Sequence, residues 1–335
     1  MMVHPNDEWS LIIFNILGQM SVGAFLALGI AHFYAVRKAG LQHADLLSTR
    51  ALFALGPILV FGMLAAVDHV GNPERTFNMI NNLDTSWLAR EVAAYGAFLV
   101  FGGMFAVLQA LSFFKLEEKL PFPEKLRENF PKIRIALAWI AAFFGVVFVY
   151  CAAMIYYDPR IASLQTGWAH MHTPILFYVD MGLLGVLALG SAFIVNYLWI
   201  SRRGTADDEL RQIQLGLLKQ SIQGMVFASV ALVGVLFVSI PIFLIYLGSE
   251  VGELNTAILT MLHTEFATLW FLRLFLAFTG AGVLSLASWY AVAQVGRERL
   301  MYFLVVGAFV CVLAAEVIAR YLFYGRNAVL VIGGV

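Results

Sequence analysis

The chain has 335 residues, of which 61% are hydrophobic and 13% charged, and its mean hydropathy is +0.84. Soluble domains carry about 25% charged residues, so this composition excludes an ordinary soluble protein and predicts an integral membrane protein. The formal net charge is +0, which gives no basis for nucleic-acid binding. The first ten residues lack the basic region that opens a cleavable signal peptide, so we expect the first apolar segment to remain as a helix.

Eight apolar segments are each long enough to cross a bilayer as a helix, which takes about 20 residues. They span residues 11–36, 51–69, 88–114, 134–157, 172–200, 219–247, 264–293 and 300–324. The runs are long and continuous, whereas the strands of a membrane β-barrel are short and alternate in polarity. We therefore expect one all-α integral membrane domain over residues 1–335, a bundle of eight transmembrane helices.

Small side chains inside these segments are typical of packing positions. Glycines recur at close spacing in the first and seventh segments, at Gly18, Gly23, Gly29, Gly280 and Gly282. Such residues favour close approach of neighbouring membrane helices. The two cysteines, Cys151 and Cys311, also lie in apolar runs and are expected to be small buried side chains. An iron–sulfur cluster takes about four thiolates, so we expect the chain to hold none by itself.

The distribution of basic residues predicts an orientation. Most of the 21 basic residues lie in the loops after the first, third, fifth and seventh segments. Basic loops stay in the cytoplasm, so we expect both termini and the loop between the second and third segments on the periplasmic side. The longest cytoplasmic connection, residues 115–133, has mixed charges and three prolines, which favour a solvated linker. Residues 202–219 are expected to form a charged helix start at the surface.

The segment between the second and third helices, residues 68–91, is unusually polar for its position. Its ionisable side chains include His69, Arg75, Asp84, Arg90 and Glu91. Ionisable groups at the ends of membrane helices commonly handle protons or ions, or contact a partner. We therefore expect the chemistry of this chain to lie in this segment.

His69 and Glu91 end the second helix and start the third, so we expect them to lie near one another. Quinol oxidation releases two protons and two electrons, and it needs a base of near-neutral pKa beside the quinol hydroxyl and a carboxylate to pass the proton on. A histidine at the membrane interface can contact a quinone oxygen while the isoprenoid tail stays in lipid. A capped helix end with a solvated histidine and glutamate is the alternative.

Charged side chains also occur within the apolar segments, where they are costly. Asp180 and Arg273 lie about two turns into their helices from the same side, so an ion pair between them is possible. Glu316 and Arg320 are four residues apart on one helix face, which favours an intrahelical pair, with a proton path as the alternative. Gln19 could bond a neighbouring side chain or a quinone carbonyl.

Two other functions remain open at this stage. In a b-type cytochrome, haem would be bound by the histidines near the periplasmic helix ends, His69, His170, His172 and His263. Haem ligands lie on facing helices at matched depth, which is not the pattern here. In a membrane transporter, Asp180 and Arg273 would line a path, although no internal repeat suggests an inverted-repeat fold.

The sequence resembles the membrane-anchor subunits of dimethyl-sulfoxide-reductase-type molybdoenzymes over most of its length. In the first helix the resemblance is carried by Glu8, Trp9, Leu11, Phe14, Gly18, Gln19 and Gly23. In the loop it is carried by His69, Gly71, Pro73, Arg75, Asn78, Ser86, Trp87, Leu88, Arg90 and Glu91. Further matches are Thr173, Pro174 and Phe177 and the ending Glu316 to Tyr324.

This resemblance implies an eight-helix subunit of a prokaryotic cytoplasmic membrane that oxidises menaquinol at a periplasmic-side site, without haem or metal. Its partners would be a four-cluster iron–sulfur subunit and a molybdopterin catalytic subunit. His69 and Glu91 would act on the quinol, with Arg75 and Gln19 as further quinol-binding residues. Partner contact or support of the site would fall to Arg90, Asn78, Trp87, Glu316 and Arg320.

Overall fold

A computed structural model describes residues 9–69, 73–158, 170–202, 208–249, 253–294 and 296–332. Over these ranges the chain is helical and contains no strand. Eight helices are long and apolar enough to cross a membrane, over Trp9–Ala39, Leu41–Gly62, Trp87–Phe113, Glu124–Tyr157, His172–Arg202, Glu209–Ser249, Ala267–Ala293 and Glu298–Tyr324. The expected all-α architecture with eight membrane-spanning helices is therefore confirmed.

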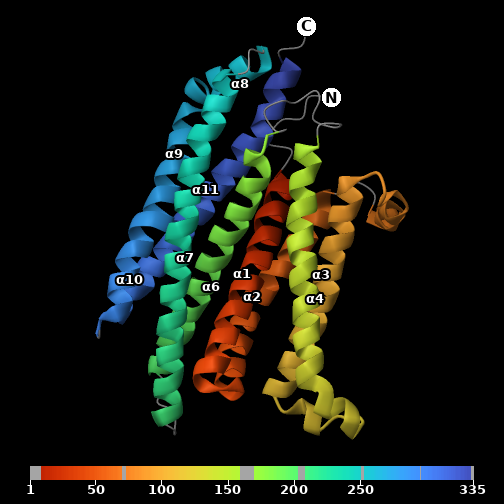
Figure 1. The fold of residues 1–335 in the computed structure, drawn as a ribbon, viewed down its shortest axis with the longest axis vertical. Helices are drawn as coiled ribbons and strands as arrows, with labels where there is room; N and C mark the ends of the chain where they lie inside the picture. The colour runs from red at the N-terminus through yellow and green to blue at the C-terminus, as the bar shows by residue number, and fades with distance from the viewer. Residues whose placement is uncertain are drawn as a thin grey trace.

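In chain order the elements are α1 (Trp9–Ala39), α2 (Leu41–His69), η2 (Pro73–Asn82), α3 (Trp87–Phe113), η3 (Leu116–Glu118), α4 (Glu124–Tyr157), α6 (His172–Arg202), α7 (Asp208–Ser249), α8 (Glu253–His263), α9 (Ala267–Ala277), η4 (Phe278–Leu284), α10 (Ser285–Ala293) and α11 (Glu298–Ile332) (Figure 1). η2 and η3 are 3₁₀ helices and η4 is a π-helical stretch. The seventh span is built from α9, η4 and α10.

Several helices extend beyond the apolar pattern. α2 begins at Leu41 rather than near residue 51. Only Gly40, whose φ of +87° breaks the helix, separates it from α1. α4 begins at Glu124, so the second half of the expected linker over 115–133 is helical. Backbone hydrogen bonds form whatever the polarity of the side chains, and a helix can therefore continue past the edge of the bilayer. α7 begins at Asp208, as its charged start predicted, whereas the short helix α8 was not predicted.

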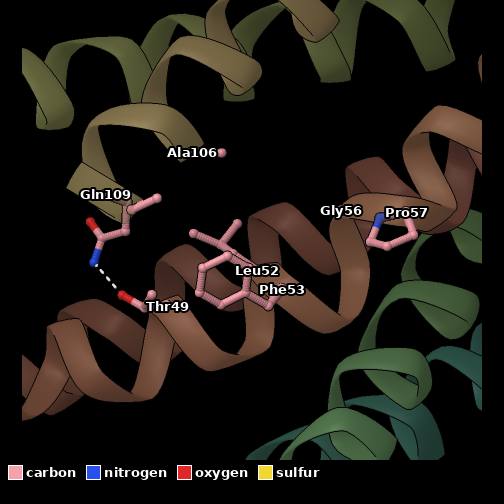
Figure 2. A pocket seen from close by; sticks show the side chains of 8 residues that line it. Thr49, Leu52, Phe53, Gly56, Pro57, Ala106 and Gln109 are labelled. Atoms are coloured by element: carbon pink, nitrogen blue, oxygen red, sulfur yellow. Dashed lines mark hydrogen bonds between the residues drawn. The ribbon is translucent and has the colours of Figure 1, made fainter. Parts of the chain in front are cut away.

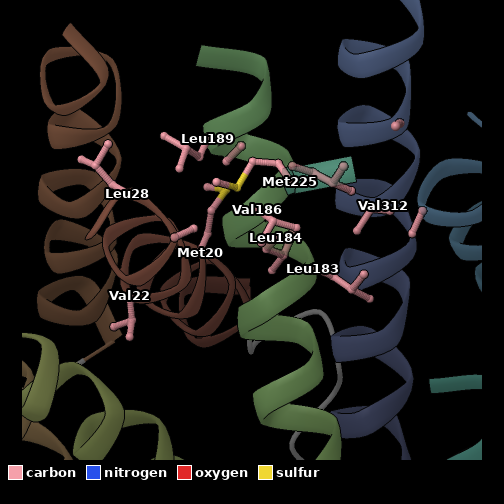
Figure 3. Packing of buried hydrophobic residues seen from close by; sticks show 14 of the residues in the cluster. Met20, Val22, Leu28, Leu183, Leu184, Val186, Leu189, Met225 and Val312 are labelled. Atoms are coloured by element: carbon pink, nitrogen blue, oxygen red, sulfur yellow. The ribbon is translucent and has the colours of Figure 1, made fainter. Parts of the chain in front are cut away.

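α1 and α6 form the centre of the bundle (Figure 1) and are the most buried of the eight spans. α1 packs against α2 and α6, and α6 packs against α7 and α11. Figure 3 shows part of this core, with Met20 of α1, Leu184 of α6, Met225 of α7 and Val312 of α11 among its buried side chains. These two helices therefore position the polar side chains described below.

The crossing of α1 and α6 depends on two glycines. A methyl group on Gly23 would overlap the carbonyl oxygen of Met181, and one on Gly185 would overlap the backbone of Gly23. This is the close backbone approach that small residues allow in membrane bundles. The packing role predicted for the glycines holds at Gly23, whereas a methyl group on Gly29 would meet nothing within 4 Å.

The outer surface of the bundle is apolar, with Trp139, Phe271 and Phe303 among its most exposed side chains. A large exposed apolar surface fits contact with lipid. α1 begins and α11 ends at the same end of the bundle, where η2 and α8 also lie (Figure 1). We call this the η2 end; α3 connects to α4, and α6 to α7, at the opposite end.

Candidate functional site

Glu91 lies in the second turn of α3, close to the η2 end, and its side chain is only 4% exposed. The helix begins where the Ser86 hydroxyl accepts a hydrogen bond of 3.2 Å from the backbone N–H of Ala89. The Glu91 carboxylate interacts electrostatically with Cys151 and Tyr156 of α4. No hydrogen bond to this carboxylate comes from the described part of the chain. A buried carboxyl group of this kind is expensive, which points to a functional role.

Aromatic rings lie one helical turn further into the bundle than Glu91. The Tyr95 ring centroid is 4.8 Å from that of Phe148 on α4 and 5.2 Å from that of Phe14 on α1. The Tyr95 hydroxyl donates to the carbonyl oxygen of Leu59 on α2 at 3.2 Å. Four helices, α1 to α4, therefore meet at Tyr95, one turn from Glu91, and the rings that meet there are largely apolar.

Two predicted residues fall where the structure gives no side-chain description. His69 is the last residue of α2 and Arg75 lies in η2, but the side chains of both lie outside the described part. Asn78 of η2 is exposed. α2 ends, and α3 begins, at the η2 end (Figure 1). A contact between His69 and Glu91 thus remains a prediction.

Trp87 and Arg90 hold the start of α3 in place. The Arg90 guanidinium donates from Nε to the Leu83 carbonyl at 2.7 Å and from Nη2 to the Asp84 carbonyl at 2.6 Å. It also lies over the Trp87 ring, 4.2 Å from the centroid. Trp87 Nε1 donates to Asp158 Oδ2 at the end of α4, at 2.7 Å. Both side chains thus order the polypeptide around Glu91, which favours the support role.

A second group of polar side chains is buried deeper in the bundle. We call it the Arg320 cluster; its members are Gln19, Asp180, Arg273, Glu316 and Arg320, none more than 2% exposed. Arg320 Nη2 donates to Asp180 Oδ2 at 2.8 Å and to Gln19 Oε1 at 2.9 Å. The ion pair of Asp180 is therefore with Arg320 of α11 rather than with Arg273 of α9. Because Glu316 and Arg320 are buried, they are placed to support the interior of the bundle rather than to contact a partner subunit.

A hydrogen-bonded trio that the sequence analysis missed lies between the two groups. Asn15 Nδ2 donates to the Tyr324 hydroxyl at 2.9 Å, and the hydroxyls of Tyr156 and Tyr324 are 3.1 Å apart. Asn15 precedes Gln19 by four residues on α1, and Tyr324 follows Arg320 by four on α11. This i, i+4 spacing of polar residues within apolar helices could have identified the trio from the sequence, because it places the polar residues of each helix on one face.

A third polar group joins α2, α3 and α4 toward the opposite end. Arg134 pairs with Asp45 at 3.2 Å and donates to Gln109 Oε1 at 2.8 Å. Gln109 Nε2 donates to Thr49 Oγ1 at 2.8 Å. Arg134, at the start of the fourth predicted segment, is therefore a buried residue within α4.

A cavity of about 260 Å³ adjoins this third group, between α2 and α3. Figure 2 shows the Thr49–Gln109 hydrogen bond at one end of it and Pro57 at the other. Its lining is mostly apolar. Gln109 is 18 positions beyond Glu91 on α3, about 27 Å along the helix at 1.5 Å per residue. The cavity is therefore not part of the Glu91 site.

Two histidines of the haem alternative, His170 and His172, lie together against α7, and the backbone N–H of His172 donates to His170 Nδ1 at 3.1 Å. The His172 ring stacks on Phe243 with centroids 4.6 Å apart, and the His170 ring stacks on Tyr246 at 4.0 Å. His263 is exposed at the end of α8. No group of three His, Cys, Asp or Glu side chains that could hold a metal occurs in the described ranges.

One family profile and one relative match this chain over nearly all of its length, and two further relatives match about half of it. The sequence profile of a family described as "DMSO reductase anchor subunit (DmsC)" matches residues 2–326. The chain is 24% identical to the C subunit of the anaerobic dimethyl sulfoxide reductase of Escherichia coli K12, over 96% of this chain and 95% of that protein. It is 30% identical to the anaerobic dimethyl sulfoxide reductase subunit YnfH of the same organism, over 53% of this chain and 55% of the relative. Identity to the C subunit of the Haemophilus influenzae Rd enzyme is 25%, over 56% of this chain and 59% of the relative.

Proposed function

Since this chain belongs to the DMSO reductase anchor subunit family, we propose that it anchors a DMSO-reductase-type complex in the prokaryotic cytoplasmic membrane and oxidises menaquinol there. The relatives are named as chains of an anaerobic dimethyl sulfoxide reductase. The partners would be a four-cluster iron–sulfur subunit and a molybdopterin catalytic subunit. The excess of basic residues in the connections at the opposite end supports a periplasmic η2 end.

The observation that carries this proposal is the buried carboxyl group of Glu91 near one end of the bundle. Quinol is lipid-soluble and must reach its oxidant from the bilayer, so the groups that take its protons have to lie within reach of the membrane. Glu91 meets this requirement, because it is 4% exposed and lies in the second turn of a membrane-spanning helix.

In the proposed reaction, His69 at the end of α2 takes a proton from a quinol hydroxyl, and Glu91 passes it toward the η2 end. The aromatic rings of Tyr95 and Phe148 give the quinol head group apolar neighbours on the membrane side. Arg75 and Gln19 were predicted as quinol contacts. Gln19 Oε1 already accepts a bond from Arg320, so Gln19 supports the polar core more directly than it could bind a quinone.

The two electrons leave for the iron–sulfur subunit, which we place over η2 and the adjoining turn. Asn78 on η2 is exposed and available for that contact. Arg90 donates to the carbonyl oxygens of residues 83 and 84. We expect it to fix the shape of the surface that the partner contacts rather than to contact the partner itself.

The test uses the assembled complex with two electron donors. Glu91→Gln and His69→Arg variants should assemble and reduce dimethyl sulfoxide with a soluble dye donor at the normal rate. With a menaquinol analogue as donor, the rate should fall by about 100-fold or more, the usual contribution of a general base. Glu265→Gln is the matched control, because Glu265 is an exposed carboxylate before α9. Normal quinol turnover in Glu91→Gln would refute the proposed role.

A further inference from the structure

The cavity between α2 and α3 opens toward the membrane. Its lining residues lie within two membrane-spanning helices, at positions 49–57 of α2 and 106–110 of α3. Phe53, Gly56 and Pro57 line it and are exposed at the surface of the bundle. α2 packs mainly on α1, and α3 packs mainly on α4, so these two helices leave room between them. A molecule can therefore enter this cavity from the lipid.

The cavity is long and apolar. Figure 2 shows Thr49 at one end of it and Pro57 at the other, and these eight positions span about 12 Å along α2. The volume is about 260 Å³, whereas a water molecule in the liquid takes about 30 Å³. Apolar lining atoms gain van der Waals contacts from a hydrocarbon chain, while water would find few polar partners there. Shape and lining therefore suit a segment of an acyl chain.

The polar side chains at one end of the cavity are already bonded to one another. Gln109 Nε2 donates to Thr49 Oγ1 at 2.8 Å and lies 3.4 Å from Asp45 Oδ1. Gln109 Oε1 accepts from Arg134 at 2.8 Å, and the Thr49 hydroxyl donates to the carbonyl oxygen of Asp45 at 2.7 Å. A quinone ring would need polar groups of the protein to fix its orientation, and these groups are engaged within the protein. This end therefore favours a plain hydrocarbon chain over a quinone head group.

A basic side chain lies where the head group of such a lipid would be. The Phe53 ring centroid is 5.8 Å from that of Phe114 at the end of α3, and Lys115 follows directly. Lys115 is exposed and has a φ of 52°, in a region that glycine adopts more readily than other residues. The backbone thus gives no reason for a lysine, whereas its ammonium group can bind a phosphate. α3 ends at the opposite end of the bundle (Figure 1), so this phosphate would lie at that membrane surface.

We propose that the cavity binds one acyl chain of a membrane phospholipid, whose phosphate group is held by Lys115. The lipid belongs to the leaflet at the opposite end, and its chain runs along α2 from Thr49 toward Pro57. Bound there, it joins the two helices whose other ends carry His69 and Glu91. The lipid site is separate from the Glu91 site and does not depend on quinol oxidation.

A phospholipid with a photoreactive diazirine in its acyl chain tests this site in the assembled complex, reconstituted in phospholipid nanodiscs. After illumination, the labelled peptides should include residues 49–57 and 106–110. Gly56→Leu should abolish this labelling, because a methyl group on Gly56 meets nothing within 4 Å in the described part of the chain, so a leucine can extend into the cavity. Ala106→Leu occupies the cavity from α3 and should have the same effect.

Gly29→Leu is the matched control, because Gly29 also has open space around it but is not a lining residue of this cavity. Label at the outer surface near Phe271 and Phe303 reports lipid that only touches the bundle, and it should be equal in all variants. Absence of label from residues 49–57 and 106–110 would overturn the inference, as would unchanged label in Gly56→Leu and Ala106→Leu. Labelling of these segments by a photoreactive menaquinone analogue, but not by the phospholipid, would overturn it as well.

The phosphate contact is tested with two lysine variants. Lys115→Gln should lower labelling of the two segments about two- to fivefold, as expected for the loss of an exposed ion pair. Lys125→Gln is its control, because Lys125 is an exposed lysine at the start of α4. Equal labelling in the two variants would overturn the phosphate contact.

Native mass spectrometry of the detergent-solubilised complex gives an independent count of bound lipid. One retained phospholipid should be lost in Gly56→Leu and kept in Gly29→Leu, and equal counts in the two variants would overturn the inference. Neither this count nor the labelling depends on quinol activity, so a negative result here would leave the proposed function standing.

Discussion

The ion pair between Arg320 and Asp180 is the contact whose removal should most weaken the bundle. Both side chains are 1% exposed, and their atoms Nη2 and Oδ2 are 2.8 Å apart. Arg320→Met keeps the length of the side chain but leaves two carboxyl groups in the Arg320 cluster with a single guanidinium. Breaking a buried pair by removing one partner costs about 3–5 kcal/mol, because the other charge stays buried.

The size of the effect follows from charge rather than from lost packing. Arg320 also lies over the Phe177 ring at 4.0 Å from the centroid, a contact worth about 2 kcal/mol when desolvated. The double variant Asp180→Asn/Arg320→Met restores neutrality. It should therefore be more stable than Arg320→Met alone by about 2 kcal/mol or more, a coupling expected for residues in contact.

Unfolding of the purified chain by sodium dodecyl sulfate, followed by circular dichroism, would measure these differences. Arg202→Met is the matched control, because Arg202 is exposed at the end of the helix that carries Asp180. It should change stability by less than about 0.5 kcal/mol. A loss of under about 1 kcal/mol in Arg320→Met, or strictly additive single variants, would refute the reasoning.

Two further variants test the packing and the start of α3, with the same unfolding assay. Gly185→Leu should lower the free energy of unfolding by about 3 kcal/mol or more, since the new side chain would collide with the backbone of Gly23. Gly29→Leu is the control and should be tolerated, because nothing in the described ranges lies within 4 Å of a methyl group there. Equal effects of the two variants would contradict the close crossing of α1 and α6. Trp87→Phe removes the donor to Asp158 and should lose about 1.5–3 kcal/mol, the usual worth of a bond to a charged group. An unchanged midpoint of unfolding in Trp87→Phe would show that this hydrogen bond does not hold α3 to α4.

The positions of the membrane spans could be predicted because hydropathy is a local property of the chain. All eight predicted segments overlap spans of the structure, since about 20 apolar residues in a row have few alternatives to a membrane helix. The first turns of α2 and α4, residues 41–50 and 124–133, escaped prediction because their side chains are more polar, whereas backbone hydrogen bonds of a helix form regardless of side-chain polarity.

At the site, the sequence identified Glu91 by its residue type and place but could not say which way it faces. Arg90 and Glu91 are neighbours, yet Arg90 bonds the preceding turn while Glu91 is buried against α4. Successive residues on a helix point about 100° apart, so the packing of α3 decides which of them enters the bundle. The family resemblance pointed to the same residue without this reason.

The amino-acid sequence by itself determined the membrane location, the number of spans and the family, because each depends on local composition or on residues in order. Only the tertiary structure decided the partners of the buried charges. Asp180 could have paired with Arg273, but Arg320, 140 positions away in the chain, is the residue that packing brings to it. Which charges meet inside a bundle depends on helix rotation and crossing, and these are set by the contacts of all the helices together.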